Sequence, residues 1–219
     1  MMNKVLCSLL LFLSISCGLQ GRNANYARDS KRIWLDSKEI HHGEYVWKMK
    51  KAGDVISSAE KVSTLGYDTS DWLSAIVPGT VLNSLVYNKE YPEPYYGVNN
   101  KLESGKIPDI SKVGREFYTY WFRTEFDVPE SFAGKTIWLQ PDGVNYRAEI
   151  WVNGNLLSTL NGMFISDYIN VTDFVKVGRK NILAVKVYPV DVPGTTMPKS
   201  WGATGEFHNG GNGNIGLNT

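Results

Sequence analysis

Apolar and polar side chains alternate along two stretches in the second half of the chain. Between residues 118 and 128 every second position is aromatic, aliphatic or threonine, and the positions between include Arg123 and Glu125. The stretch 145–155 alternates in the same way before it reaches Asn153-Gly154. A period of two predicts β-strands with one buried face and one wetter face. Asn153-Gly154 predicts a tight turn between two strands, because both residue types tolerate positive φ.

The same patterning extends this sheet over most of the chain. A short helix is expected at Val81–Tyr87, where apolar residues fall at positions 81, 82, 85 and 86. The segment 54–66 fits either a short strand or irregular structure. Short strands separated by Gly, Asn and Pro turns predict an all-β sandwich or jelly roll with one short helix. The expected strands are 43–50, 117–128, 136–140, 146–152, 156–160, 167–171 and 181–188.

Two long segments in the middle of the chain carry no regular pattern. Tyr91–Asn100 contains two prolines and a glycine, which exclude a regular central strand, and 101–114 continues as a connector. Loops of this length in a compact domain are often functional. After Pro189 the chain becomes rich in Gly and Asn. We expect no terminal strand there, disorder from about Gly205 onward, and a sequence that is cut short.

The beginning of the chain has the features of an export signal. Lys4 supplies a positive charge, and Val5–Ile15 is an apolar run too short to span a bilayer comfortably. Cys17 follows this run within Ser-Cys-Gly, as in bacterial lipoproteins, which predicts lipidation of Cys17; ordinary signal cleavage nearby is the alternative. We expect an exported protein, in the periplasm or as an outer-membrane or cell-surface lipoprotein. The expected organisation is a signal peptide at 1–16, a polar tether at 17–32 and a β-sandwich domain at 33–219.

Composition narrows the function classes. Of the 219 residues 42% are hydrophobic, enough for a sizeable core, and the formal net charge is +1. The chain therefore lacks the excess of positive charge that is typical of nucleic-acid-binding proteins, and nucleic acid is not an expected partner. Cys7 and Cys17 are the two cysteines, so cleavage before Cys17 leaves no disulfide pair. His41 and His42 are adjacent and His208 is distant, so we expect no metal site and no cofactor.

Five short motifs are spread over nearly the whole chain after residue 33. They are Trp72–Leu82, Pro92–Gly97, Tyr120–Arg123, Ala148–Gly154 and Asn181–Val185. Each motif is weak alone, but their order and spacing together resemble the N-terminal sugar-binding domain of family-2 glycoside hydrolases. The subgroup that the chain resembles most is the β-mannosidase and exo-β-glucosaminidase type.

The resemblance implies a galactose-binding-domain-like jelly roll, which in that family precedes an immunoglobulin-like domain and a (β/α)₈ barrel. The barrel carries the two catalytic glutamates, a pair that retaining glycosidases hold about 5 Å apart. The family's acid/base glutamate follows an asparagine, and no Asn-Glu dipeptide occurs in this chain. The chain is therefore expected to be an N-terminal fragment of an exported hydrolase, with no catalytic residue of its own.

The resemblance also implies a substrate class and partners. The parent would act on β-linked glycosides, namely a β-mannoside, β-glucosaminide or β-galactoside. Expected partners are carbohydrate and the remaining domains of the parent, with membrane contact only through a lipid on Cys17. A free-standing carbohydrate-binding or cell-surface adhesion module is the alternative. The DNA immediately downstream distinguishes the two, because the fragment requires a barrel encoded in frame.

Three sets of residues are candidates for sugar contact or chemistry. By analogy with the family, Tyr95, Asn99 and Asn100 in the loop before the Tyr120 strand are candidate substrate-binding residues; the alternative is that the asparagines cap turns. The tryptophans of the strands either stack on sugar rings or, as we expect, pack under loops or a neighbouring domain. Glu149 is either a catalytic carboxylate or, as we expect, a partner in a cross-strand ion pair. The tryptophans in question are Trp121, Trp138 and Trp151.

Overall fold

The computed structural model describes residues 32–99, 101, 104–108, 113, 115–162, 165–189 and 216–218. One compact unit runs from Ile33 to Thr219. The expected signal peptide, Cys17 and the tether up to residue 31 lie outside the described residues. Within the part of the chain that the structure describes, no helix is long and apolar enough to cross a membrane.

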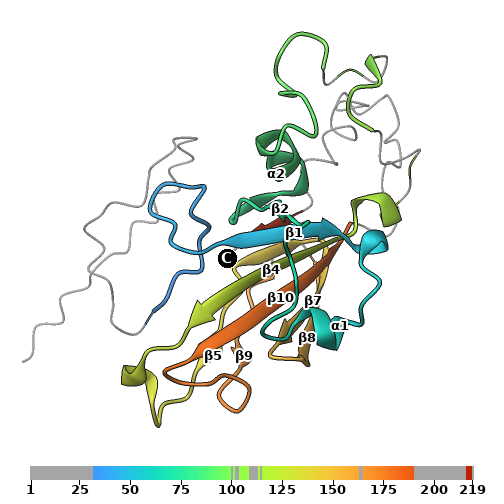
Figure 1. The fold of residues 1–219 in the computed structure, drawn as a ribbon. Coiled ribbons are helices and arrows are strands. Elements are labelled where there is room, and N and C mark those ends of the chain that lie inside the picture. The colour runs from blue at the N-terminus through green and yellow to red at the C-terminus, as the bar shows by residue number, and fades with distance from the viewer. Residues whose placement is uncertain are drawn as a thin grey trace, which may run out of the picture. The chain divides into compact units, whose positions relative to one another are not determined.

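The unit is built from antiparallel sheets with few helices (Figure 1). The largest sheet has six strands in the order β2-β1-β4-β10-β7-β8, and smaller sheets have the orders β3-β11-β6 and β5-β9. The six strands are β1 (Trp47–Lys51), β2 (Leu73–Ser74), β4 (Tyr120–Asp127), β7 (Arg147–Val152), β8 (Asn155–Asn161) and β10 (Lys180–Tyr188). The smaller sheets contain β3 (Gly79–Thr80), β5 (Trp138–Leu139), β6 (Gly143–Asn145), β9 (Ile169–Asn170) and β11 (Gly216–Asn218). The helices whose bounds the structure describes are α1 (Ala59–Val62) and α2 (Val81–Tyr87), with 3₁₀ turns at Ala52–Asp54, Arg115–Tyr118 and Glu130–Phe132.

Strands β4 and β10 form the middle of the six-stranded sheet, with Tyr120 opposite Val187 and Asp127 opposite Lys180. The alternation in their sequences places every second side chain on the inner face of the sheet. There Phe122 and Val185 are almost completely buried. The inner face packs against the smaller sheets and α2, which contribute buried residues to the same core. The residues from those smaller elements include Val81, Leu85, Val144 and Ile169, and Val77, between β2 and β3, joins the same core.

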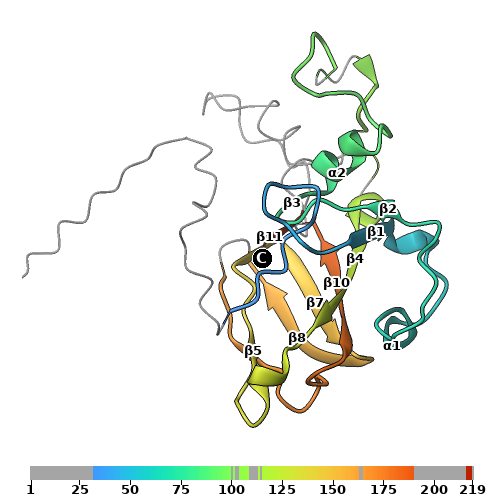
Figure 2. The ribbon, with the colours of Figure 1, turned by 60° about the vertical axis from the view of Figure 1, so that its left-hand side comes forward.

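The outer face of the sheet is also covered, so the prediction that one face of β4 is wetter is wrong. Trp121 is 3% exposed and Arg123 is 4% exposed. Figure 2 shows α1 on one side of β4 and β10, with β3, β5 and β11 on the other side. The segment around α1 buries Val62 and Trp72 against the sheet in a second apolar cluster, which we call the outer cluster. Its buried members are Val62, Trp72, Trp121, Trp151 and Ala184.

Several local predictions can be compared with the structure directly. The helix at Val81–Tyr87 is confirmed as α2, and Asn153-Gly154 joins β7 to β8 with φ of 48° and 89°. The ambiguous segment 54–66 contains α1, whose first turn is capped by the Ser58 hydroxyl accepting from the Lys61 amide.

The C-terminal part departs from expectation at one place. The predicted absence of a terminal strand is wrong at Gly216–Asn218, because the backbone of β11 pairs with both β3 and β6. A run of Gly and Asn shows no period-2 pattern, so this pairing has no sequence signal. Disorder was predicted from about Gly205 onward; β11 contradicts it at Gly216–Asn218, and residues 205–215 and 219 lie outside the described residues.

Candidate functional site

The candidate site is the loop that follows α2, and α2 itself is fixed at both ends. The Thr80 hydroxyl accepts from the Asn83 amide at 3.0 Å at the start of the helix. At the other end Nδ2 of Asn88 donates to the Ser74 carbonyl oxygen at 2.8 Å, and the Ser74 amide donates back to Oδ1 of Asn88 at 3.3 Å. Inside the helix Oγ of Ser84 accepts from the buried Ile76 amide at 3.0 Å. The loop therefore leaves the domain from a helix that is bound tightly to β2.

Asn99 organises the loop from inside. Its side chain is 6% exposed, and its Nδ2 donates to the Glu93 carbonyl oxygen at 2.9 Å. Nζ of Lys106 donates to Oδ1 of Asn99 at 2.8 Å, and Oγ of Ser104 donates to the Asn99 carbonyl oxygen at 3.2 Å. These hydrogen bonds connect Asn99 to Glu93 before it and to Ser104 and Lys106 after it. Asn99 thus makes the kind of turn contact named as its alternative role, and its contact with a sugar stays a prediction.

The same loop projects two aromatic rings away from the domain. Tyr95 is 92% exposed and Tyr96 is 78% exposed, whereas Tyr91 at the start of the loop packs against the core. The Tyr96 amide donates to the Glu93 carbonyl oxygen at 3.2 Å, which fixes the turn that carries both rings. Asn100 lies outside the described residues. The loop can therefore present Tyr95 to a ligand or to a neighbouring domain, and the assignment of Tyr95 as a substrate-binding residue stays a prediction.

Glu149 holds the outer face of β7 and β10 together. The Tyr188 hydroxyl donates to its Oε1 at 2.5 Å, and Nε1 of Trp151 donates to its Oε2 at 3.2 Å. These bonds stand in place of the cross-strand ion pair that was expected. Both oxygens of this carboxylate accept hydrogen bonds from neighbours on the sheet, so Glu149 has a structural role here.

The three candidate tryptophans differ in their surroundings. Trp121 and Trp151 belong to the outer cluster, which confirms that they pack under another segment. Nζ of Lys186 lies 5.7 Å from the centre of the Trp121 ring, at the edge of this cluster. Trp138 is 53% exposed on β5, so no loop among the described residues covers it, and its packing under a neighbouring domain stays a prediction. It is the tryptophan among the three whose ring is open to a ligand.

The histidines do not form a metal site within the part of the chain that the structure describes. His41 and His42 lie in a turn before β1, with ring centres 3.6 Å apart, and His208 lies outside the described residues. Among the described residues, no group of three His, Cys, Asp or Glu side chains converges in a way that could hold a metal ion.

Comparison with known families identifies the domain. The family model for the glycosyl hydrolase 2 galactose-binding domain-like domain matches residues 47–203, which begin at the first residue of β1. The chain belongs to this family. The match covers the six-stranded sheet, α2 and the loop after it, so the candidate site lies within the family domain.

Similar proteins are much longer than this chain. The mannosylglycoprotein endo-β-mannosidase of Lilium longiflorum is 40% identical over 131 residues, which are 60% of this chain and 13% of that protein. The exo-β-D-glucosaminidase of Amycolatopsis orientalis is 29% identical over 149 residues, 67% of this chain and 13% of that protein. The β-galactosidase of an Arthrobacter species is 28% identical over 151 residues, covering 63% and 14%.

A solved structure shares the fold. The crystal structure of the exo-chitosanase of Amycolatopsis orientalis superimposes with a TM-score of 0.56 at 28% identity, covering 69% of this chain and 17% of that one. The chain thus corresponds to the N-terminal, galactose-binding-like domain of family-2 glycoside hydrolases and spans a small part of their length.

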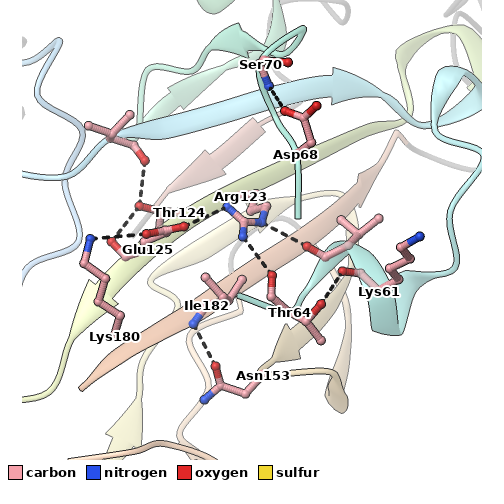
Figure 3. Close-up of polar contacts among 12 residues, drawn as sticks. Lys61, Thr64, Asp68, Ser70, Arg123, Thr124, Glu125, Asn153, Lys180 and Ile182 are labelled. Atoms are coloured by element: carbon pink, nitrogen blue, oxygen red, sulfur yellow. Dashed lines mark hydrogen bonds and ion pairs between the residues drawn. The ribbon is translucent and has the colours of Figure 1, made fainter. Parts of the chain in front are cut away.

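Arg123 is the residue that sequence reasoning missed. Its Nε donates to the Val62 carbonyl oxygen at 3.0 Å, and its Nη2 donates to the Thr64 carbonyl oxygen at 3.0 Å (Figure 3). Burial lowers the pKa of this guanidinium, and the nearby Glu125 carboxylate opposes that effect. The sequence carried no signal for this burial, because arginine is mostly an exposed residue type and the alternation assigns Arg123 to the wetter face.

Proposed function

We propose that this chain is the N-terminal domain of an exported hydrolase of β-linked glycosides, and that the loop Tyr91–Asn99 forms part of the wall around the substrate. The observation that carries the proposal is the family match over residues 47–203 in a chain that spans 13% of its endo-β-mannosidase relative. The relatives named above support a β-mannoside, β-glucosaminide or β-galactoside as the substrate class. Catalysis would reside in the part of the parent that this chain does not contain.

The geometry of the loop supports its role beside the substrate. Asn99 braces the turn from within through Glu93 and Lys106, so the backbone that carries the exposed Tyr95 ring is held by the rest of the loop. The loop backbone therefore needs little ordering when a sugar or a neighbouring domain packs on the ring. In this proposal Asn99 is a positioning residue for the loop, and Tyr95 makes the contact.

The proposal is tested on the native protein. Antibodies raised against the chain recover it from the source cells, and the recovered material is assayed with chromogenic β-mannoside, β-glucosaminide and β-galactoside. We expect a protein longer than 219 residues that hydrolyses at least one of them. Recovery of a chain of only this length without turnover would overturn the proposal and favour a free-standing carbohydrate-binding or adhesion module.

A second experiment addresses the loop. In the recovered hydrolase, produced recombinantly, Tyr95→Ala is expected to raise KM with a smaller effect on kcat, because the ring contributes binding away from the reacting bond. Tyr87→Ala is the matched control, since Tyr87 is an exposed tyrosine at the end of α2 that precedes the loop. Equal KM values for both variants and the wild type would exclude Tyr95 from the substrate wall.

A further inference from the structure

The ribbon formed by β5 and β9 has one face in the core and one face exposed. Trp138 lies opposite Asn170, and Leu139 lies opposite Ile169 (Figure 1 shows the two strands side by side). Side chains alternate across a strand, so Leu139 and Ile169 share one face and Trp138 and Asn170 share the other. Leu139 and Ile169 pack in the main core. The face that carries Trp138 therefore points away from it, and we call this face the ribbon face.

A second aromatic residue belongs to the ribbon face. Tyr168 comes directly before β9, and the Asp167 amide donates to the Pro141 carbonyl oxygen at 3.4 Å, so the pairing of the two segments continues past Tyr168. The alternation continued in this way places Tyr168 on the side of Asn170. Its side chain is 60% exposed, compared with 53% for Trp138. In the register of the ribbon Tyr168 is diagonal to Trp138, a separation of roughly 7–8 Å that large side chains can bridge. Two large rings are thus displayed together, where a soluble protein normally exposes such residues singly.

Amide and hydroxyl groups flank the two rings. Nε2 of Gln140, two positions after Trp138, donates to Oδ1 of Asp142 at 3.2 Å and to Oγ of Ser166 at 3.4 Å. Oδ1 of Asn170 accepts from the amide and the hydroxyl of Thr172 at 3.0 and 2.7 Å. These bonds fix the plane of the Asn170 amide, and Nδ2 remains as its donor.

We propose that the ribbon face binds a neutral β-linked polysaccharide, with sugar rings stacked on Trp138 and Tyr168 and hydroxyl groups bonded to Gln140 and Asn170. A pyranose ring has apolar faces and a rim of hydroxyl groups, which matches aromatic faces bordered by amides. Protein interfaces also favour Trp and Tyr, but they are depleted in Asp and Ser, the residue types that border these rings at Asp142 and Ser166. An open two-stranded ribbon suits an extended chain, whereas a single small sugar would require a concave pocket.

This site differs in position and role from the loop at Tyr95. It would hold the polymer and requires no catalytic domain, so it does not depend on the proposed function. Because only two rings contribute, binding is expected to be weak for one sugar and measurable for a polymer that offers many.

The test is affinity electrophoresis of the 219-residue chain in gels containing soluble glucomannan, soluble β-1,4-galactan or, as an α-linked control, dextran. We expect retardation by at least one β-linked polymer and none by dextran. Trp138→Ala and Tyr168→Ala are each expected to weaken the association about two- to tenfold, as loss of one aromatic contact does. Trp138→Phe should retain part of the binding, and Tyr87→Ala, at an exposed tyrosine at the end of α2, should bind as the wild type.

The outcomes separate this proposal from its rivals. Absence of retardation in both β-linked polymers, or unchanged retardation of Trp138→Ala, overturns it. Loss of binding in Tyr95→Ala but not in Trp138→Ala assigns sugar binding to the loop instead. Sedimentation of the same variants tests whether the ribbon face is instead a contact between copies of the chain. A variant whose self-association changes while its polymer binding does not would identify such a contact and overturn the proposal.

Discussion

Arg123 donates a hydrogen bond from Nε to the carbonyl oxygen of Val62 at 3.0 Å, although the two residues are 61 positions apart in the chain. A second bond, from Nη2 to the Thr64 carbonyl oxygen, uses the same planar guanidinium. The pair joins the outer face of β4 to the C-terminal end of α1. Val62, Trp72 and Trp121 then pack together in the outer cluster, so this hydrogen bond and the apolar cluster depend on each other.

Replacement of Arg123 is expected to loosen the segment around α1. Arg123→Met keeps similar bulk but leaves the Val62 and Thr64 carbonyl oxygens without this donor, which should lower the free energy of unfolding by about 1–3 kcal/mol. Arg123→Lys should also destabilise, because an ammonium group does not reproduce the two-pronged geometry. Urea unfolding followed by tryptophan fluorescence measures the change, and limited proteolysis reports whether residues 55–72 become accessible first.

Arg179→Met is the matched control for Arg123, because Arg179 is exposed in the turn before β10. We expect it to change the unfolding free energy by less than about 0.5 kcal/mol. An Arg123→Met protein as stable as this control would show that the guanidinium does not hold the α1 segment in place.

Asn181 fills every hydrogen-bonding position of a fully buried amide. Its Oδ1 accepts from Nδ2 of Asn153 at 2.8 Å and from the Lys176 amide at 2.7 Å, and its Nδ2 donates to the Lys176 and Arg179 carbonyl oxygens at 2.9 and 2.8 Å. Asn181→Asp turns the donor into an acceptor that faces two carbonyl oxygens. We expect a loss of about 2–4 kcal/mol at neutral pH, measured by chemical unfolding.

The Asn181→Asp variant carries its own internal check. At about pH 4 the carboxyl group becomes protonated and regains one donor, so part of the lost stability should return relative to the wild type at the same pH. Asn83→Asp is the control, because Asn83 is exposed in the first turn of α2, where a negative charge is tolerated. A neutral effect of Asn181→Asp at pH 7 would contradict the described network.

The limits of sequence reasoning are clearest at the tryptophans. Trp121 and Trp138 both lie in strands beside apolar positions, yet one is covered and the other is open. What covers Trp121 is Val62 and Trp72, which are remote in sequence and lie outside its own strand. Alternation reveals which residues share a face, whereas the burial of that face depends on segments that arrive from elsewhere.

Local signals predicted the elements that depend on local physics. The helix at Val81–Tyr87 has its apolar spacing and its Thr80 cap in the sequence itself, and the Asn153-Gly154 turn needs only residues that accept positive φ. β11 has no such signal, because its pairing uses backbone groups alone. The loop was located by its prolines, but the inward position of Asn99 depends on Lys106 and Glu93, whose contact the sequence does not reveal.

Buried tyrosine makes the stability of the domain sensitive to alkaline pH. Burial raises the pKa of Tyr120 above its ordinary value of 10.0, and the nearby Tyr91, Asp54 and Glu90 add to this effect. A raised folded-state pKa contributes stability that is complete below pH 10 and is lost as the pH rises above it, because the unfolded chain ionises first. Thermal unfolding between about pH 9 and pH 11 should therefore show a steeper loss for the wild type than for Tyr120→Phe. Tyr95→Phe, at an exposed ring, should keep the wild-type slope.

Cys17 is expected to become the lipidated N-terminus of the mature protein. The basis is the apolar run Val5–Ile15 followed by Ser16-Cys17-Gly18. Several acyl chains anchor a protein to a membrane stably, whereas an unmodified terminus does not. After expression in a bacterium that processes lipoproteins, the wild type should enter the detergent phase of a phase-separation extract and Cys17→Ser the aqueous phase. Equal partition of both into the aqueous phase would favour ordinary signal cleavage.

The chain by itself is expected to hydrolyse none of the chromogenic β-mannoside, β-glucosaminide and β-galactoside substrates. Glycosidases place two carboxyl groups on either side of the bond that breaks, about 5–5.5 Å apart in retaining enzymes. Glu149, the carboxylate considered for such a role, already accepts hydrogen bonds from Tyr188 and Trp151. Glu149→Gln should consequently alter the stability of the sheet, and neither this variant nor the wild type should hydrolyse the substrates. Glu130→Gln, at an exposed turn, is the control for the stability measurement and for the activity assay. Turnover that survives stringent purification and disappears in Glu149→Gln but not in Glu130→Gln would show that this domain carries catalytic chemistry of its own.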